Sequence, residues 1–135
     1  MVNRGFSLIE LLIALTILAI VAAFAVPSYG AYVTETRRSD AHIALIRVAQ
    51  QQEQFHSLNS NYATALTDLG AAGQSAQGYY TLSLANVGCT TGYVGCFQVT
   101  ATAVGAQASD TDCATLSLDQ SGLRSATGGG TECWP

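Results

Sequence analysis

The chain has 135 residues, a formal net charge of −4 and a sequence pI of about 4.8. Its basic residues are five arginines, and only 10% of all residues are charged. The length predicts one small domain with a modest core. The acidic balance argues against broad nucleic-acid binding, which needs many cations facing phosphates, although a small local group of arginines remains compatible with it.

The first predicted element is an apolar helix over residues 6–26, in which Glu10 is the one acidic residue. As a helix, this segment is about 31 Å long, enough to cross a hydrocarbon core of about 30 Å. Gly5 follows the positive charge of Arg4, and no clean cleavage site between small residues ends the apolar run, so we expect the run to be retained. A membrane anchor explains the length but not Glu10, because a carboxylate at a bilayer centre costs about 2.5–3.5 kcal/mol.

The helical pattern continues after Pro27, which we expect to kink the helix because proline cannot donate a backbone hydrogen bond. One apolar stripe follows at helical spacing. Its members are Ala41, Ala44, Leu45, Val48 and Phe55, with Ile43, Ile46 and Ala49 widening it on one side. The helix is predicted to end at residues 59–62, "NSNY".

The second half of the chain alternates apolar and polar residues, which is typical of strands with one buried face. Strands are predicted over residues 79–85 and 97–104, and a third around Leu116 and Leu118. A turn at residues 119–122 leads into a short return strand that begins at Leu123. We expect an antiparallel meander that packs its apolar face on the helix stripe, which is an α+β fold.

Four cysteines lie in this half: Cys89, Cys96, Cys113 and Cys133. An even number behind an export-like N-terminus favours disulfides, and the spacing lacks the CxxC pairs or nearby histidines of a zinc site. Four cysteines allow three pairings. We expect Cys89–Cys96 to close the loop between the first two strands, and Cys113–Cys133 to hold the C-terminal tail beside the third strand.

The N-terminal stretch "GFSLIE", residues 5–10, followed by a long apolar helix and Pro27, resembles the class III signal of the type IV pilin family. The resemblance implies that a prepilin peptidase cleaves between Gly5 and Phe6 and then N-methylates Phe6. It also implies three segments: a leader over residues 1–5, a transmembrane and filament-core helix over 6–27, and a globular domain over 28–135.

The resemblance also gives Glu10 and Phe6 a role in assembly. In the family, this glutamate is thought to attract the N-terminal ammonium of a neighbouring subunit, here that of Phe6. Each charge would then have a partner in apolar surroundings. The alternative is an ion pair within the first turn of one chain, where an acid near a helix N-terminus is favourable anyway.

The segment "CATLSLDQSGLRS" and the ending "ECWP" resemble PilE-type minor pilins, whereas "CTTGYVGC" departs from that pattern. The implied fold is a long kinked N-terminal helix packed on three to four antiparallel strands. The implied function is a structural subunit that joins or primes a pilus used in twitching motility, adhesion or DNA uptake. A type II secretion pseudopilin and a DNA-binding competence pilin are the alternatives.

The same resemblance implies a location and partners. The subunit is expected in the inner membrane before assembly and in the extracellular filament afterwards. Its expected partners are other pilin subunits, the prepilin peptidase/N-methyltransferase and an inner-membrane assembly platform, with nucleic acid unlikely. We expect no enzymatic activity, cofactor or metal.

The remaining polar residues have structural explanations. We expect His42 and His56 on the helix surface, and Arg37 and Arg38 in a membrane-proximal or intersubunit salt bridge. Three acids could in principle hold Ca²⁺ but lack an EF-hand pattern, so solvated loop positions are favoured for Asp110, Asp112 and Asp119.

Overall fold

A computed structural model of the chain describes residues 7–86 and 95–135, except for the side chains of residues 25–28. Its long helix α1 spans Leu8–Asn59 and is followed by a short 3₁₀ turn, η1, over Leu66–Leu69. The chain divides into two compact units, Met1–Glu35 and Thr36–Pro135, and each is considered by itself. The predicted kink at Pro27 and the three predicted segments stay predictions.

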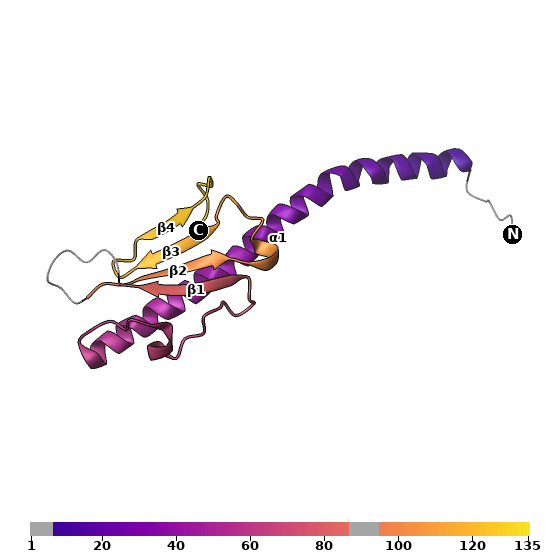
Figure 1. Cartoon of the computed structure of the whole chain (residues 1–135). Coiled ribbons are helices and arrows are strands. Elements are labelled where there is room, and N and C mark those ends of the chain that lie inside the picture. The colour runs from indigo at the N-terminus through magenta and orange to yellow at the C-terminus, as the bar shows by residue number, and fades with distance from the viewer. Residues whose placement is uncertain (1–6, 87–94) are drawn as a thin grey trace. The chain divides into compact units, whose positions relative to one another are not determined.

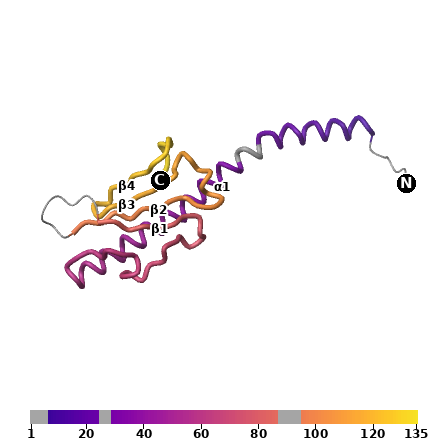
Figure 2. Tube along the Cα trace, in the orientation of Figure 1, coloured from indigo at the N-terminus to yellow at the C-terminus, as the bar shows by residue number. Residues whose placement is uncertain are grey.

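The second unit contains a four-stranded antiparallel sheet in the order β1-β2-β3-β4, so each strand pairs with the next one along the chain (Figures 1 and 2). A second 3₁₀ turn, η2, spans Gly105–Gln107. The strand bounds are β1 Tyr80–Ala85, β2 Gln98–Ala103, β3 Thr115–Asp119 and β4 Arg124–Thr127. The α+β class and the predicted meander are therefore confirmed.

The core of this unit lies between α1 and one face of the sheet. The stripe on α1 supplies Ala41, Leu45 and Val48, each at most 2% exposed. The sheet opposes them with alternate residues, and its buried members include Tyr80, Val99, Ala101, Leu116 and Leu118. The register aligns Val99 with Leu118 and Ala101 with Leu116, so the apolar side chains share one face.

The predicted stripe is wrong at its edge. Ile43 is 60% exposed and Ile46 41% exposed, whereas Ala49 packs against the core. The buried positions are 40, 41, 44, 45, 48 and 52, which share one face of the helix, and Ile43 and Ile46 lie outside it. Position 52 is a glutamine, and a search for hydrophobic periodicity does not identify a buried polar residue.

Gln52 is 0% exposed and joins the end of the helix to the next segment. Its Nε2 donates to the carbonyl of Ala63 at 3.0 Å, and the amide of Ala63 donates to its Oε1 at 2.9 Å. The chain reverses between them at Ser60, whose φ of 58° lies in the left-handed region. The Gln52 side chain thus gives the Ala63 amide an acceptor and the Ala63 carbonyl a donor, as a paired backbone segment would.

The C-terminal tail is held by the predicted disulfide Cys113–Cys133, which is present. Gly130 donates its amide to the carbonyl of Asp112 at 2.9 Å. A Cβ on Gly128, which has a φ of 132°, would lie 2.2 Å from the same carbonyl oxygen, so this approach requires glycine. Cys96 is also disulfide-bonded, but Cys89 lies outside the described residues, so its pairing stays a prediction.

Replacing Gln52 with methionine, which keeps a similar volume, should leave the buried amide and carbonyl of Ala63 without partners. We expect a loss of about 2–4 kcal/mol in the free energy of unfolding, measured by urea denaturation. The exposed Gln54→Met is the matched control and should change stability by less than about 0.5 kcal/mol. Equal effects of the two substitutions would contradict the structural role of Gln52.

Candidate functional site

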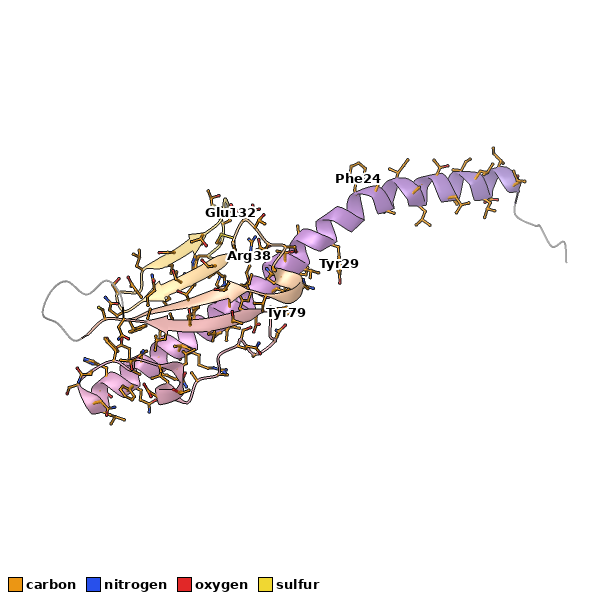
Figure 3. All side chains as sticks on the ribbon, viewed as in Figure 1. Phe24, Tyr29, Arg38, Tyr79 and Glu132 are labelled. Carbon is orange, nitrogen blue, oxygen red and sulfur yellow. A yellow bond between two sulfur atoms is a disulfide. The ribbon has the colours of Figure 1, made fainter. Side chains whose placement is uncertain are left out.

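The first unit presents apolar side chains without a protein cover. From Leu8 to Phe24 the large apolar side chains are all more than half exposed, and Phe24 stands out from the helix (Figure 3). By length and composition, α1 includes a stretch that could cross a membrane. Thr16 does not add an open polar group, because its hydroxyl donates to the Leu12 carbonyl at 2.8 Å. This surface is suited to lipid or to other apolar helices.

Glu10 lies in the first turn of α1 on this surface. It has no hydrogen bond or ion pair among residues 7–86 and 95–135, and it is exposed. Gly5 and Phe6, the predicted cleavage and methylation positions, lie outside the described residues. The predicted pairing of Glu10 with a Phe6 ammonium therefore stays a prediction.

In the second unit, Arg38 and Asp110 form a salt bridge within the chain. Arg38 Nε donates to Asp110 Oδ2 and Nη2 donates to Oδ1, both at 2.7 Å. Gln107 and the amide of Cys113 donate to the same carboxylate. The hydrogen bonds from Arg38 lower the pKa of Asp110 against the opposing effect of its burial.

Two predictions fail at this salt bridge. Arg38 forms its salt bridge within the chain rather than at a membrane or with another subunit. Asp110 is not a solvated loop acid, since its side chain is 3% exposed. Arg38 precedes Ala41 by three positions and Leu45 by seven, so it lies on the buried face of the helix. The spacing of Arg38 from Ala41 and Leu45 could have indicated that Arg38 faces the core. A search for apolar residues alone does not consider an arginine.

Two further arginines contact aromatic rings of their own chain. The Arg37 guanidinium lies 4.8 Å from the centre of the Tyr79 ring, and that of Arg124 lies 5.3 Å from the centre of the Trp134 ring. Arg37 also donates to the Ala106 carbonyl at 3.4 Å. Of the four arginines in the described part of the chain, only Arg47 has neither a hydrogen bond nor an ion pair.

The histidines are structural, but they are not the simple surface residues predicted. His42 stacks on Trp134 with ring centres 4.6 Å apart, and His56 stacks on Tyr62 at 4.5 Å. His42 Nε2 donates to the Cys133 carbonyl at 2.9 Å, so this nitrogen carries the proton. Burial lowers the pKa of His42. The pair of rings fastens the tail to α1.

The acids and histidines do not gather into a metal site. Over the described residues, no three of the His, Cys, Asp and Glu side chains are placed to hold a metal ion. Asp119 instead shapes the predicted turn: its Oδ1 accepts from the amides of Ser121 and Leu123 at 2.8 and 3.0 Å. The Ser121 hydroxyl also donates to it, and these bonds lower the pKa of Asp119.

Two family profiles together match most of the chain. The profile of the prokaryotic N-terminal methylation motif matches residues 1–26. The profile described as "Type IV minor pilin ComP, DNA uptake sequence receptor" matches residues 27–117. The apolar helix and small antiparallel sheet already define a pilin-like protein. The chain belongs to the type IV pilin family.

Individual relatives agree with this assignment. The type IV major pilin protein PilA of Myxococcus xanthus is 33% identical over 88 residues, covering 64% of this chain and 40% of that protein. The type IV major fimbrial protein FimA of Dichelobacter nodosus is 33% identical over 85 residues, covering 60% and 51%. The chain thus matches about half or less of the length of these relatives.

A solved structure also shares the fold. The structure of a type IV pilin from Shewanella oneidensis superposes with a TM-score of 0.54 at 28% identity, covering 76% of this chain and 98% of that one. The predicted pilin fold is therefore confirmed. These similarities are to a family of structural pilins rather than to a family of enzymes.

The salt bridge predicts a specific loss of stability in acid. Because Arg38 lowers the pKa of Asp110 in the folded state, the stabilisation is present above the pKa of the unfolded carboxyl, about 4. It is lost as the pH falls through the lower pKa of the folded state. Asp110→Asn should cost about 2–4 kcal/mol at pH 7 and flatten the dependence of unfolding free energy on pH below about 4.

Asp112→Asn is the matched control, because Asp112 is exposed and contacts the tail through its backbone carbonyl. Urea denaturation from pH 7 to pH 2 gives both curves. An Asp110→Asn curve that runs parallel to that of the unchanged protein would exclude the salt bridge as the source of the acid effect.

Proposed function

We propose that this chain is a structural subunit of a type IV pilus, held in the inner membrane by α1 before assembly. The observation that carries the proposal is the uncovered apolar surface from Leu8 to Phe24, joined to a folded unit by one continuous helix. In water this surface would be unfavourable, so it needs lipid first and other helices afterwards. The methylation-motif profile over residues 1–26 supports processing at Gly5 and Phe6.

The proposed sequence of membrane insertion, processing and assembly requires specific partners. A prepilin peptidase removes residues 1–5 and methylates Phe6, an inner-membrane platform receives the subunit, and neighbouring pilins cover its apolar helix. A minor rather than a major subunit is favoured by the family profile, although the curated relatives are major pilins. Twitching, adhesion and DNA uptake are the activities that such a filament would serve.

The role of Glu10 in assembly gives the experiment that tests the proposal. Glu10→Leu should still insert, since the helix becomes more apolar, and the second unit should still fold. Its incorporation should fall at least tenfold, because the Phe6 ammonium of the docking neighbour would be buried without its partner. The measurement is the ratio of this subunit in sheared pili to its amount in the inner membrane.

Glu35→Gln is the control, because it also removes one exposed carboxylate from the first unit. Glu10→Asp should lie between, since it keeps the charge and shortens the reach by one methylene. If Glu10→Leu assembles as well as Glu35→Gln, the carboxylate serves only its own chain.

A DNA receptor is a second candidate, and one observation favours it: the family profile over residues 27–117 carries that description. The charges of the second unit count against it. Asp110 engages Arg38, and the ring of Trp134 already contacts His42 and Arg124 of its own chain rather than standing free for stacking on a base. Arg37, Arg47 and Arg124 remain without a carboxylate partner in the described residues.

Three such arginines limit the phosphate contacts of one subunit. We expect the processed protein to retard a short DNA duplex only above about 1 μM at physiological salt, the range of non-specific binding. The slope of log K against log salt should be no steeper than about −3. Retardation of one duplex sequence at nanomolar concentration, with scrambled duplex unshifted, would establish the receptor function instead.

A further inference from the structure

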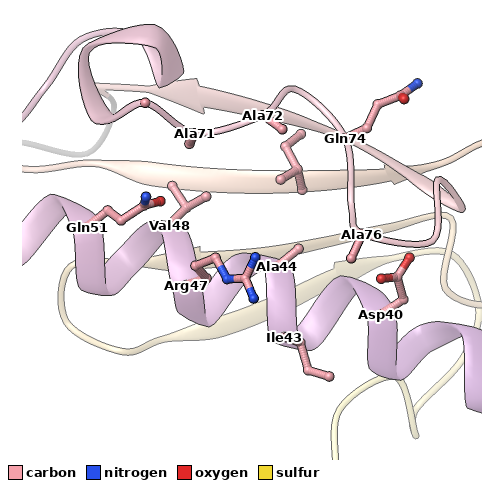
Figure 4. Close-up of a pocket in the computed structure, with 12 residues that line it drawn as sticks. Asp40, Ile43, Ala44, Arg47, Val48, Gln51, Ala71, Ala72, Gln74 and Ala76 are labelled. Atoms are coloured by element: carbon pink, nitrogen blue, oxygen red, sulfur yellow. The ribbon is translucent and has the colours of Figure 1, made fainter.

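A groove with a volume of about 250 Å³ lies in the second unit, between α1 and the segment that precedes β1 (Figure 4). Ala44 and Val48 line it from the helix, and Ala71, Ala72 and Leu82 line it from the opposite side. The groove is smaller than the sites of drug-sized ligands, which are about 300–1,000 Å³. Truncating a leucine in a protein core can leave a cavity of about 150 Å³, so the groove has room for one leucine side chain.

Two exposed residues of α1, Ile43 and Arg47, also line the groove. The Arg47 guanidinium has no ion pair or hydrogen bond in residues 7–86 and 95–135. Asp40, the acid that lines the groove, is 5% exposed, so the accessible charge is that of Arg47. An apolar groove beside an accessible cation is suited to an apolar side chain that has an acid next to it.

The turn between β3 and β4, residues 119–123, presents such a pair. Leu123 is 63% exposed, and Asp119 is partly exposed. Asp119 Oδ1 accepts from the amides of Ser121 and Leu123, and the Leu123 carbonyl accepts from the Asp119 amide at 3.2 Å. These bonds fix the backbone on both sides of the leucine, so binding through Leu123 requires little further ordering. The hydrogen bonds from Ser121 and Leu123 also lower the pKa of Asp119, so its carboxylate is charged at neutral pH.

Leu123 does not reach the groove of its own chain. The groove is beside β1, which contributes Leu82, whereas Leu123 directly precedes β4. β1 and β4 are the two edge strands of the sheet, and neighbouring strands lie about 4.8 Å apart, so at least about 14 Å separates the two. A contact between this leucine and this groove therefore needs two copies of the chain.

We propose that Leu123 of one copy enters the groove of a second copy, where its neighbour Asp119 faces Arg47. Leu123 contacts Ala44 and Ala72 of the second copy, and Ile43 shields the contact from water. This inference rests on the proposed function and deepens it, because a pilus brings many copies of one chain together. The leucine and the groove are different surfaces of one chain, so the contact is heterologous and can repeat in one direction along a filament.

The test separates the two halves of the contact in two variants of the full chain, both in detergent micelles. Leu123→Ser keeps the groove and loses the leucine, whereas Ala72→Phe keeps the leucine and fills the groove. Both positions are exposed, so both variants should fold, which their amide NMR spectra check. The ¹⁵N-labelled Leu123→Ser chain is then titrated with the unlabelled Ala72→Phe chain. We expect saturable shifts of the amides of Ala71 and Ala72.

Unlabelled Leu123→Ser is the negative titrant, and its affinity should be about tenfold weaker or more, because the apolar anchor is missing from both copies. The matched control is the titrant Ala72→Phe with Leu58→Ser, which loses a different exposed leucine and should bind like Ala72→Phe alone. Equal affinities of the titrants with and without Leu123, or no saturable shift with Ala72→Phe, would overturn the proposal. No pilus takes part in this titration, so its failure is distinguishable from a failure of the Glu10→Leu experiment.

A double-mutant cycle tests the charges. Arg47→Gln removes the cation from the labelled chain, and Asp119→Asn in the titrant removes the charge but keeps an oxygen for the turn. Each should weaken binding about twofold to fivefold, the range for an exposed ion pair. The two together should weaken it no more than one alone, because they remove the same interaction. The titrant control Asp112→Asn removes an exposed carboxylate outside the turn and should have no effect. If the two losses multiply, Asp119 does not face Arg47 and the proposed orientation is wrong.

Discussion

The packing of Ala41, Leu45 and Val48 against the sheet is the interaction on which the second unit depends. These residues contact a face built from alternate residues of β1, β2 and β3, and the core cluster contains all of them. Two of the four strands have only five or four residues, so the sheet is too small to bury its apolar face alone. The helix is therefore the second layer of the domain as well as its extension toward the N-terminus.

Polar groups on the same helical row fix how the helix sits. Arg38 precedes the apolar residues and meets Asp110, and Gln52 follows them and meets Ala63. With apolar contacts alone, α1 could shift along its own axis relative to the sheet, because apolar contacts are not directional. The hydrogen bonds of Arg38 and Gln52 require defined distances and angles. A shift of the helix would therefore leave donors or acceptors unpaired at both ends of the apolar stripe.

The sequence predicted the fold class, the strands and the disulfide Cys113–Cys133 because each has a signal in the sequence. The signals are the periodicity of apolar residues, the turn residues, and the number and positions of the cysteines. It failed where a polar residue occupies an apolar row. Gln52 and Asp110 are buried, and Arg38 is partly buried, because hydrogen-bond partners outside their own elements satisfy them, and no local sequence pattern identifies those partners. The groove between α1 and the segment before β1 was missed for the same reason, since one side comes from α1 and the other from residues further along the chain, among them Ala71 and Leu82 (Figure 4).

The C-terminal tail also alters the outer edge of the sheet. β4 is exposed along all four of its residues and would otherwise offer a row of backbone acceptors to any strand that approached. Trp134 Nε1 donates to the carbonyl of Ser125 at 2.9 Å, and the disulfide and His42 hold the indole in place. A tail that occupies this acceptor leaves one backbone partner fewer for a strand of another copy, so it hinders edge-to-edge pairing as well as fastening the last residues.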